Sequence, residues 1–326
     1  MEKNGRERNI FGGCVFGPVP SRRLGRSLGI DLIPFKTCTF NCIYCQLGRT
    51  VHQTIERKAY VPGKQVIKQL EEKLTILSPP PDYITFSGSG EPTLNSEMGW
   101  VMEEINRMTK IPIAVLTNSS LLHLEAVRQS LMSADLVIPS LDAASPQLLK
   151  SINRPHHSLA FRQILNGLKE FRREFGGQLW LEVMLCAGMN DDLTEIHRLG
   201  ETIDAIGPNR IHLNTVIRPP AEGFAHPLSP DRMETVRNEL GSKAEILPDF
   251  PELEKHVSIP MRDEEIIGLL KRRPSTVEEI SRALGYELES TFQCLNDLDR
   301  RGVIHQRMFH DRCYYEGTLA RQKAFR

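Results

Sequence analysis

Three cysteines stand close together near the start of the chain, and they constrain its fold more than any other feature. Cys38, Cys42 and Cys45 are separated by three and two residues. Thiolates are soft ligands that select zinc, copper(I) or iron–sulfur clusters, and one tight loop can turn three sulfurs toward one centre. A structural zinc ion needs a fourth ligand, which His52 could supply. A four-iron cluster on three cysteines instead leaves one iron open to a small molecule.

The composition is that of an ordinary globular protein, with 40% hydrophobic and 25% charged residues in 326 positions. No apolar run reaches the roughly 18–20 residues that span a bilayer, and the N-terminus lacks a signal-peptide core. We therefore expect a cytoplasmic protein with no membrane contact. Seven cysteines, three of them bunched, do not suggest a disulfide framework. Residues 1–68 are basic, which suits either an anionic partner or a solvated face.

Strand and helix patterns alternate through the first three quarters of the chain. The expected strands are 28–33, 83–86, 111–116, 136–141, 179–185 and 211–216, with a last one at 244–247. Repeated βα units imply a parallel sheet covered by helices. Six such units predict an α/β fold of the partial (β/α)6 barrel type.

Polar residues and glycines follow the expected strands, at the end where barrel enzymes place their active sites. After the cysteines these are Gly88, Gly90, Glu91, Asn118, Ser140, Asp142, Asn190, Asn214 and Arg218. One open cavity lined by them is the simplest interpretation.

Each candidate has a chemical role and a plainer structural one. Glu91, beside a glycine loop with exposed backbone carbonyls, could hold an ammonium group. Ser140 and Asp142 suit sugar hydroxyls, but they are equally good caps for the next helix. Asn118 is of a type common in turns. Arg218 could grip a cofactor carboxylate or an anionic substrate.

Three further positions are open. Glu182, inside an expected strand, could face the cavity or pair with a basic neighbour. Arg154 could contact substrate or cofactor. The basic loop 21–26 could anchor a substrate or pack against the cysteine loop.

The C-x3-C-x2-C spacing, with Tyr44 directly before the last cysteine, resembles the signature of the radical S-adenosylmethionine superfamily. Residues 16–25 and 57–62 are similar to a branch of iron–sulfur oxidoreductases related to wyosine-type tRNA-modifying enzymes, a resemblance covering roughly residues 14–250. It implies a [4Fe-4S] cluster on the three cysteines whose open iron binds S-adenosylmethionine. Reductive cleavage of that cofactor would give a 5′-deoxyadenosyl radical that abstracts hydrogen from a substrate.

The resemblance also implies roles for individual residues. Gly88, Gly90 and Glu91 would hold the amino group of S-adenosylmethionine, and Ser140 with Asp142 would contact its ribose or carboxylate. An electron donor such as flavodoxin or ferredoxin is implied. The substrate stays open among RNA, peptides and small molecules, because Cys14 is alone upstream and supplies no second cluster of the wyosine kind.

The last part of the chain is expected to form a separate module. Three short helices at 263–271, 277–284 and 290–298, then strands at 303–305 and 313–315, resemble a winged helix-turn-helix. Its third helix region, 287–301, carries four acids against two arginines, which opposes phosphate binding. We therefore favour a protein- or peptide-binding domain over a DNA-binding one.

The expected organisation is a tail (1–13), the barrel (14–250), a linker (251–262), the winged-helix-like domain (263–318) and a second tail (319–326). Two other classes of function fit the same motifs. One is a non-enzymatic iron–sulfur redox regulator that binds DNA through the winged helix. The other is a zinc-stabilised binding protein.

Overall fold

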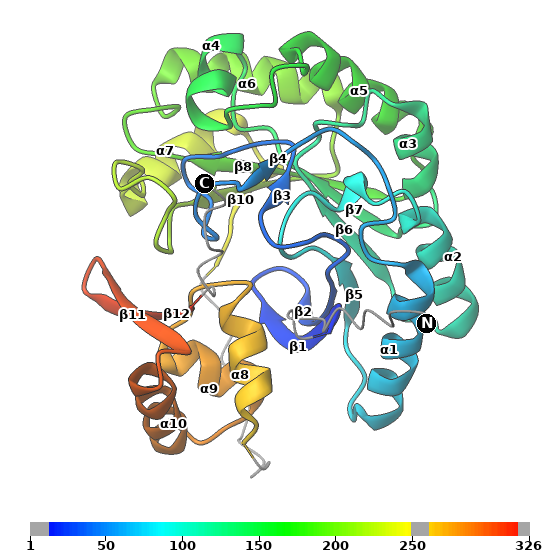
Figure 1. Cartoon of the computed structure of the whole chain (residues 1–326). Helices are drawn as coiled ribbons and strands as arrows, with labels where there is room; N and C mark the ends of the chain where they lie inside the picture. The colour runs from blue at the N-terminus through cyan, green and yellow to red at the C-terminus, as the bar shows by residue number, and fades with distance from the viewer. Residues whose placement is uncertain (1–12, 249–260, 319–326) are drawn as a thin grey trace, which may run out of the picture.

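A curved, mostly parallel sheet forms the body of the protein in the computed structural model, which describes residues 13–248 and 261–318 (Figure 1). The strand order is β1-β2-β5-β6-β7-β8-β9-β10, and every neighbouring pair from β2 to β10 is parallel. The strands are β1 (Val15–Ser21), β2 (Gly25–Ile30), β5 (Tyr83–Phe86), β6 (Ile113–Thr117), β7 (Leu136–Pro139), β8 (Gln178–Leu185), β9 (Arg210–Thr215) and β10 (Ala244–Ile246). The predicted α/β fold with a parallel sheet is thus confirmed.

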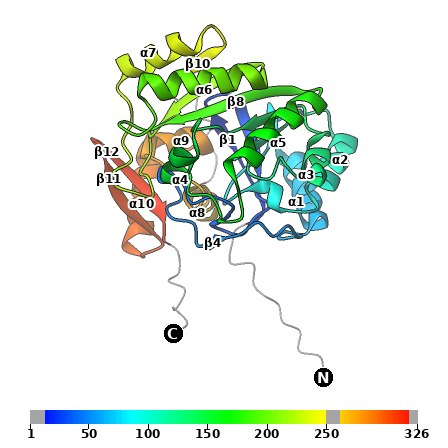
Figure 2. The same cartoon turned by 90° about the horizontal axis from the view of Figure 1, so that it is seen from above.

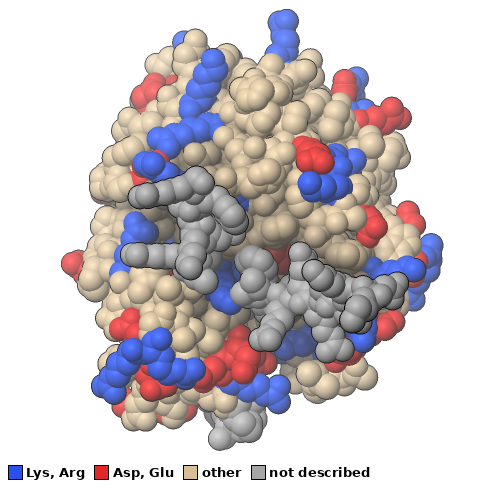
Figure 3. All heavy atoms as spheres, viewed as in Figure 1, with Lys and Arg blue, Asp and Glu red and all other residues tan. Residues whose placement is uncertain are grey.

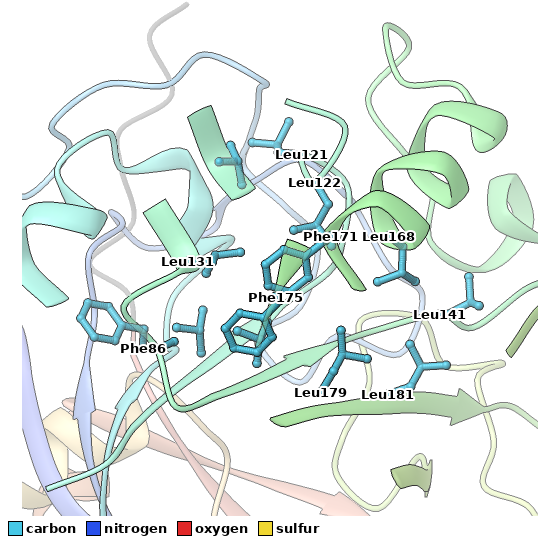
Figure 4. Packing of buried hydrophobic residues seen from close by; sticks show 14 of the residues in the cluster. Phe86, Leu121, Leu122, Leu131, Leu141, Leu168, Phe171, Phe175, Leu179 and Leu181 are labelled. Atoms are coloured by element: carbon cyan, nitrogen blue, oxygen red, sulfur yellow. The ribbon is translucent and has the colours of Figure 1, made fainter. Parts of the chain in front are cut away.

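Seven of the described helices lie between strands of the sheet in the chain and cover its outer face (Figures 1 and 2). They are α1 (Gly63–Ile76), α2 (Met98–Met108), α3 (Glu125–Leu131), α4 (Pro146–Ile152), α5 (Phe161–Glu174), α6 (Leu193–Ile206) and α7 (Pro230–Leu240). Figure 4 shows the packing on α5, where Phe171 and Phe175 stack with ring centroids 4.8 Å apart near Leu179 of β8. These apolar contacts fix each helix over its strands and leave the carboxyl ends of the strands to carry the polar loops.

The first strands differ from the prediction. The strand expected at 28–33 is β2, which runs from Gly25 to Ile30 and pairs with β1 in a hairpin that the sequence did not predict. Pro18 and Pro20 argue against a strand in the sheet interior, because proline cannot donate to a ladder. β1 lies at the edge of the sheet, where proline is tolerated because no second neighbouring strand needs its backbone N–H as a donor.

The basic loop 21–26 forms the turn of this hairpin and enters the barrel. Leu24 is buried in a cluster with Ala114, Leu136 and Ile138. Arg23 forms an ion pair with Glu182 of β8, in which each side chain is 13% exposed. The loop therefore packs against residues of β6, β7 and β8 rather than against the cysteine loop. Of the two roles that the sequence allowed for Glu182, the structure shows the ion pair with a basic residue.

The C-terminal residues form a smaller domain with its own apolar core (Figure 1). Its elements are α8 (Asp263–Leu270), α9 (Val277–Leu284), α10 (Leu288–Arg300) and the antiparallel hairpin β11 (Ile304–Phe309) with β12 (Arg312–Gly317). Three helices and a hairpin occur in the expected order. Whether they act as a winged helix-turn-helix stays a prediction, and most of the predicted linker and both predicted tails lie outside the described residues.

The C-terminal domain packs against β1 and the loop after β9. Helices α8 and α9 contact β1, and Val19 of β1 joins the apolar core of the domain. The hydroxyl of Tyr314 donates to the carbonyl of Ile217 at 2.9 Å. Among the described helices, none combines the length and the apolar character that a membrane crossing requires.

Candidate active site

The cysteines lie in the long loop between β2 and α1, at the carboxyl end of the sheet. Cys38 belongs to β3 (Thr37–Cys38), a two-residue strand that pairs in parallel with β4 (His52–Gln53). The other two sit in tight turns, in which the amide of Cys45 donates to the carbonyl of Cys42 at 3.2 Å. One loop thus presents all three sulfurs, as their spacing predicted.

Two asparagine amides from other elements point at these sulfurs. Asn118, directly after β6, has its Nδ2 atom 3.5 Å from the sulfur of Cys38. Asn153, directly after α4, has its Nδ2 atom 3.5 Å from the sulfur of Cys42. N–H donors stabilise thiolate charge, so both contacts suit a metal-bound sulfur.

Burial is the main reason why the thiol pKa values rise in the metal-free protein. It raises the pKa of Cys38 to about 12, with the charge of Glu91 adding to the effect. It also raises the pKa of Cys42 well above the ordinary value, and that of Cys45 in the same direction. A thiolate is the form of cysteine that binds a metal, so loading of a metal at this site releases protons.

The donor set fits a four-iron cluster held at three corners. Within residues 13–248 and 261–318, no three His, Cys, Asp or Glu side chains converge on a single metal ion. A [4Fe-4S] cluster binds each thiolate at a different iron, so its ligands need not share one point. His52, the possible fourth ligand of a zinc site, is exposed at the start of β4.

A carboxylate after β9 clamps the cysteine loop to the segment after α4. Glu222 accepts hydrogen bonds from Arg49 at 3.0 and 2.9 Å and from Arg154 at 2.5 Å. Its amide donates to the carbonyl of Ile43, between the cysteines, at 2.9 Å. Arg154 thus acts as part of a clamp, a role that the sequence did not reveal.

The glycine loop after β5 packs directly against the cysteine loop. A Cβ atom on Gly90 would lie 1.8 Å from the carbonyl oxygen of Thr37, one residue before Cys38. Gly88 has a φ of +135°, and a Cβ there would lie 2.6 Å from the carboxyl carbon of Asp31. Glycine is required at both positions, because only a bare backbone can approach so closely.

Glu91 ties the glycine loop to the end of β6. One carboxylate oxygen accepts from the amide and hydroxyl of Thr93 at 3.1 and 2.6 Å and from the hydroxyl of Thr117 at 2.7 Å. The other accepts from the amide of Asn118 at 2.7 Å. Burial raises the pKa of Glu91, and these hydrogen bonds oppose that rise. The Glu91 carboxylate thereby fixes the backbone of Asn118, whose side-chain amide points at the sulfur of Cys38.

Asp142, after β7, supports the aromatic residue of the cysteine motif. The hydroxyl of Tyr44 and the amide nitrogen of Asn153 both donate to its carboxylate, the latter at 2.6 Å. The amide of Met184 donates to its second oxygen at 2.9 Å. Burial raises the pKa of Asp142 to about 6, against the effect of these donors.

Several of the residues singled out from the sequence come together. Asn118, Ser140 and Asp142 line one small cavity, which Asn153 also borders. Asn190 donates to the carbonyls of Asp142 and Met184 at 2.8 and 2.9 Å. It therefore holds the loop after β7 against β8.

Arg218 does not join this group. Its guanidinium forms an ion pair with Glu279 of the C-terminal domain at 3.0 Å and donates to the carbonyl of Pro274 at 2.9 Å. Both partners of the ion pair are 8% exposed. The structure thus directs Arg218 to the boundary between the domains.

Sequence reasoning missed two residues that hold the cysteine loop. Glu222 lies in a Pro- and Gly-rich segment with no strand or helix pattern of its own. Asn153 stands at a helix end, where asparagine is common for local reasons. The one sequence signal that could have indicated Glu222 was the excess of arginine around the cysteines, because a buried arginine needs an acidic partner.

Comparisons with known proteins agree with this geometry. Residues 32–200 match the family model described as the radical SAM superfamily, whose members use a [4Fe-4S] cluster and S-adenosylmethionine. The chain is 34% identical to a UPF0026 protein of Methanocaldococcus jannaschii, covering 92% of this chain and 95% of that protein. It is also 38% identical to a protein of Brachyspira hyodysenteriae named GTPase Obg, covering 90% of this chain but only 43% of that protein.

The fold has a solved counterpart. A radical SAM methyltransferase from Sphaerobacter thermophilus superposes with a TM-score of 0.50 at 17% identity, over 68% of this chain and 65% of that one. At this identity the likeness concerns the fold alone. The matched family model and the UPF0026 relative show that the chain belongs to the radical SAM superfamily and to the UPF0026 proteins.

Proposed function

We propose that this protein is an enzyme that binds a [4Fe-4S] cluster through Cys38, Cys42 and Cys45 and cleaves S-adenosylmethionine reductively. The observation that carries the proposal is the convergence of three thiols, two amide donors and a glycine loop at one end of the sheet. When bound, the cluster supplies the electron that splits the cofactor into methionine and a 5′-deoxyadenosyl radical, which takes hydrogen from the substrate. The chain's own contribution is to bind, orient and shield these groups.

Each neighbouring residue has a proposed task. The backbone of Gly88 and Gly90 would receive the amino group of the cofactor, because no side chain obstructs it there. Glu91 would keep that backbone in place. Asn118, Ser140 and Asp142, which directly follow β6 and β7, would contact the ribose or the carboxylate.

The proposal has implications for partners and location. The cleavage consumes one electron, so a reductant such as flavodoxin or ferredoxin is needed. None of the seven cysteines, all of which lie in the described residues, forms a disulfide, which suits a reducing compartment such as the cytoplasm. We propose that the substrate radical then loses a further electron to an acceptor, which would make the enzyme an oxidoreductase on an RNA, a peptide or a small molecule.

The decisive experiment measures 5′-deoxyadenosine released by anaerobically reconstituted, dithionite-reduced protein supplied with S-adenosylmethionine. We expect release by the wild type and none by Cys42→Ala. Cys313→Ala is the matched control, since this thiol lies in β12 of the other domain, and it should release as much as the wild type. No release by the wild type, or equal release by Cys42→Ala, would refute the proposal.

We infer that the C-terminal domain binds a protein or peptide rather than DNA. Leu288 and Phe292, one turn apart on α10, are 47% and 44% exposed and present an apolar face. Acidic and basic side chains intermingle on the side of this domain seen in Figure 3, and α10 itself carries an excess of acid. DNA affinity needs a surface that neutralises phosphates.

Fluorescence anisotropy with a labelled 30-base-pair duplex tests this inference. We expect no saturable binding at 50 mM salt. Tight binding that weakens steeply with salt and survives Cys42→Ala would favour the DNA-binding regulator instead.

A further inference from the structure

Asp31, directly after β2, connects the glycine loop to the C-terminal domain. Its carboxylate accepts a hydrogen bond from the amide of Ser89 at 3.1 Å and from the Ser89 hydroxyl at 2.6 Å. The same carboxylate forms an ion pair with Arg272 at 3.1 Å, in which the two side chains are only 6% and 10% exposed. Ser89 lies between the two glycines proposed to receive the cofactor.

Arg272 is held on several sides and cannot easily swing away. It lies just beyond the end of α8, where its guanidinium donates to the carbonyl of Gly268 at 3.0 Å. It also donates to the carbonyl of Gly13 at 2.8 Å, and it lies over the ring of Phe16 with 4.5 Å to the centroid. The C-terminal domain thus presents a rigid cation to Asp31, which in turn holds the glycine loop.

The glycine loop has little freedom to compensate for a shift of Asp31. Its other side is fixed by the cysteine loop, since the amide of Lys36 donates to the carbonyl of Ser89 at 2.7 Å. Any displacement of the Asp31 carboxylate therefore moves Ser89 relative to the cysteines. The backbone on either side of Ser89 moves with it.

We propose that Arg272 is a positioning residue for S-adenosylmethionine. Acting through Asp31 and Ser89, it fixes the backbone of residues 88–90 in the conformation that receives the cofactor's amino group. This inference rests on the function proposed above. It makes the C-terminal domain part of the cofactor site, and it links domain docking and cofactor binding reciprocally.

The test compares the full-length wild type with Arg272→Ala, Arg272→Lys and the control Lys73→Ala. Lys73 of α1 forms another ion pair across the domain boundary, with Glu265 at 3.6 Å, and it belongs to a different element from the glycine loop. Equilibrium dialysis of anaerobically reconstituted protein measures the dissociation constant of S-adenosylmethionine. Hydrogen–deuterium exchange of residues 84–94 in cofactor-free protein reports the loop directly.

We expect Arg272→Ala to weaken cofactor binding about tenfold, a typical coupling between linked sites. The KM for S-adenosylmethionine should rise by the same factor, with little change in kcat for 5′-deoxyadenosine release. Exchange should accelerate in residues 84–94 but not in α5 or α6. Arg272→Lys should retain part of the affinity for S-adenosylmethionine, since it keeps the positive charge but loses the several N–H donors of the planar guanidinium. Lys73→Ala should match the wild type.

Ser89→Ala provides a second test if Arg272→Ala does not fold. It removes the hydrogen bond from the Ser89 hydroxyl to Asp31 and leaves the ion pair between Asp31 and Arg272 intact. It should also raise the KM for S-adenosylmethionine and loosen the loop. Unchanged affinity and loop exchange in a folded Arg272→Ala or in Ser89→Ala would overturn the inference while leaving the proposed function standing. A wild type that binds no S-adenosylmethionine would instead defeat the proposed function, and this inference with it.

Discussion

The guanidinium of Arg49 grips the carboxylate of Glu222 through two hydrogen bonds of 3.0 and 2.9 Å, although 173 residues separate them in the chain. Hydrogen bonds from Arg49 and then Arg154 lower the pKa of Glu222, so it stays ionised at neutral pH. The clamp joins the segment after Cys45 to the segment after α4. It closes the loop whose sulfurs have to stay in place when the cluster is bound.

Replacing the clamp carboxylate should loosen the cluster. We expect Glu222→Gln to lose iron to a chelator roughly five- to tenfold faster than the wild type, because its charge-assisted hydrogen bonds to Arg49 and Arg154 are weakened. The absorbance of the iron–chelator complex follows the loss. Glu234→Gln, which breaks an exposed pair with Arg237 on α7, is the matched control and should leave the rate unchanged. Equal rates for the wild type and Glu222→Gln would contradict the clamp.

The contact between the two loops predicts a strong effect at Gly90. Its replacement by Ala would drive a Cβ into the carbonyl of Thr37 and should lower the free energy of unfolding by about 3 kcal/mol, because backbone must shift to make room. Iron content after reconstitution should fall as well. Gly176→Ala is the control, since nothing lies within 4 Å of a Cβ there. Urea unfolding compares the two, and similar midpoints would count against the close approach.

The ion pair inside the barrel should matter more than pairs on its surface. Burial alone would raise the pKa of Glu182, but Arg23 and Asn214 more than offset it and hold the pKa below its usual value. Glu182→Ala leaves Arg23 without its carboxylate and should cost about 3 kcal/mol. Glu245→Ala, which breaks an exposed pair with Arg210, should cost no more than about 0.5 kcal/mol. Urea unfolding measures both, and equal costs would be the contrary result.

His212 of β9 predicts a pH dependence of stability. Burial, followed by the charge of Arg23, lowers its pKa to about 4, whereas Glu182 acts in the opposite direction. The unfolded chain therefore binds a proton between about pH 6.5 and 4 that the folded chain does not, so stability falls as the pH falls through this window. The loss reaches on the order of 3 kcal/mol.

Comparison of the wild type with His212→Gln isolates this contribution, since the other titrating groups are common to both. The difference between their free energies of unfolding should change from pH 7 to pH 4, with the wild type losing more. A difference independent of pH would show that His212 titrates normally.

What the sequence could predict was local in the chain. The spacing of the cysteines sets the ligand loop, and apolar periodicity sets the alternation of strands and helices. Because parallel strands end at one edge, the polar loops after β5, β6 and β7 could also be placed together. Their predicted direct roles as cofactor ligands stay predictions.

What escaped prediction depends on partners far apart in the chain. Asp31 and Arg272 are 241 positions apart, and Arg23 and Glu182 are 159 apart. No periodicity indicates which loop carboxylate meets which arginine, since that depends on how the sheet curves and where the second domain docks. Arg218 illustrates this, because a loop at the carboxyl end of β9 faces both the barrel and the domain beside it.

The hairpin of the C-terminal domain has a consequence for the lifetime of the cluster in air. Phe309 of β11 belongs to the same apolar cluster as Val216, Ile43 and Tyr44, and the last two lie between Cys42 and Cys45. A chain cut before α8 would lack Phe309 and would leave this apolar cluster incomplete on one side. We therefore expect aerobic bleaching of the reconstituted cluster to be faster without the small domain.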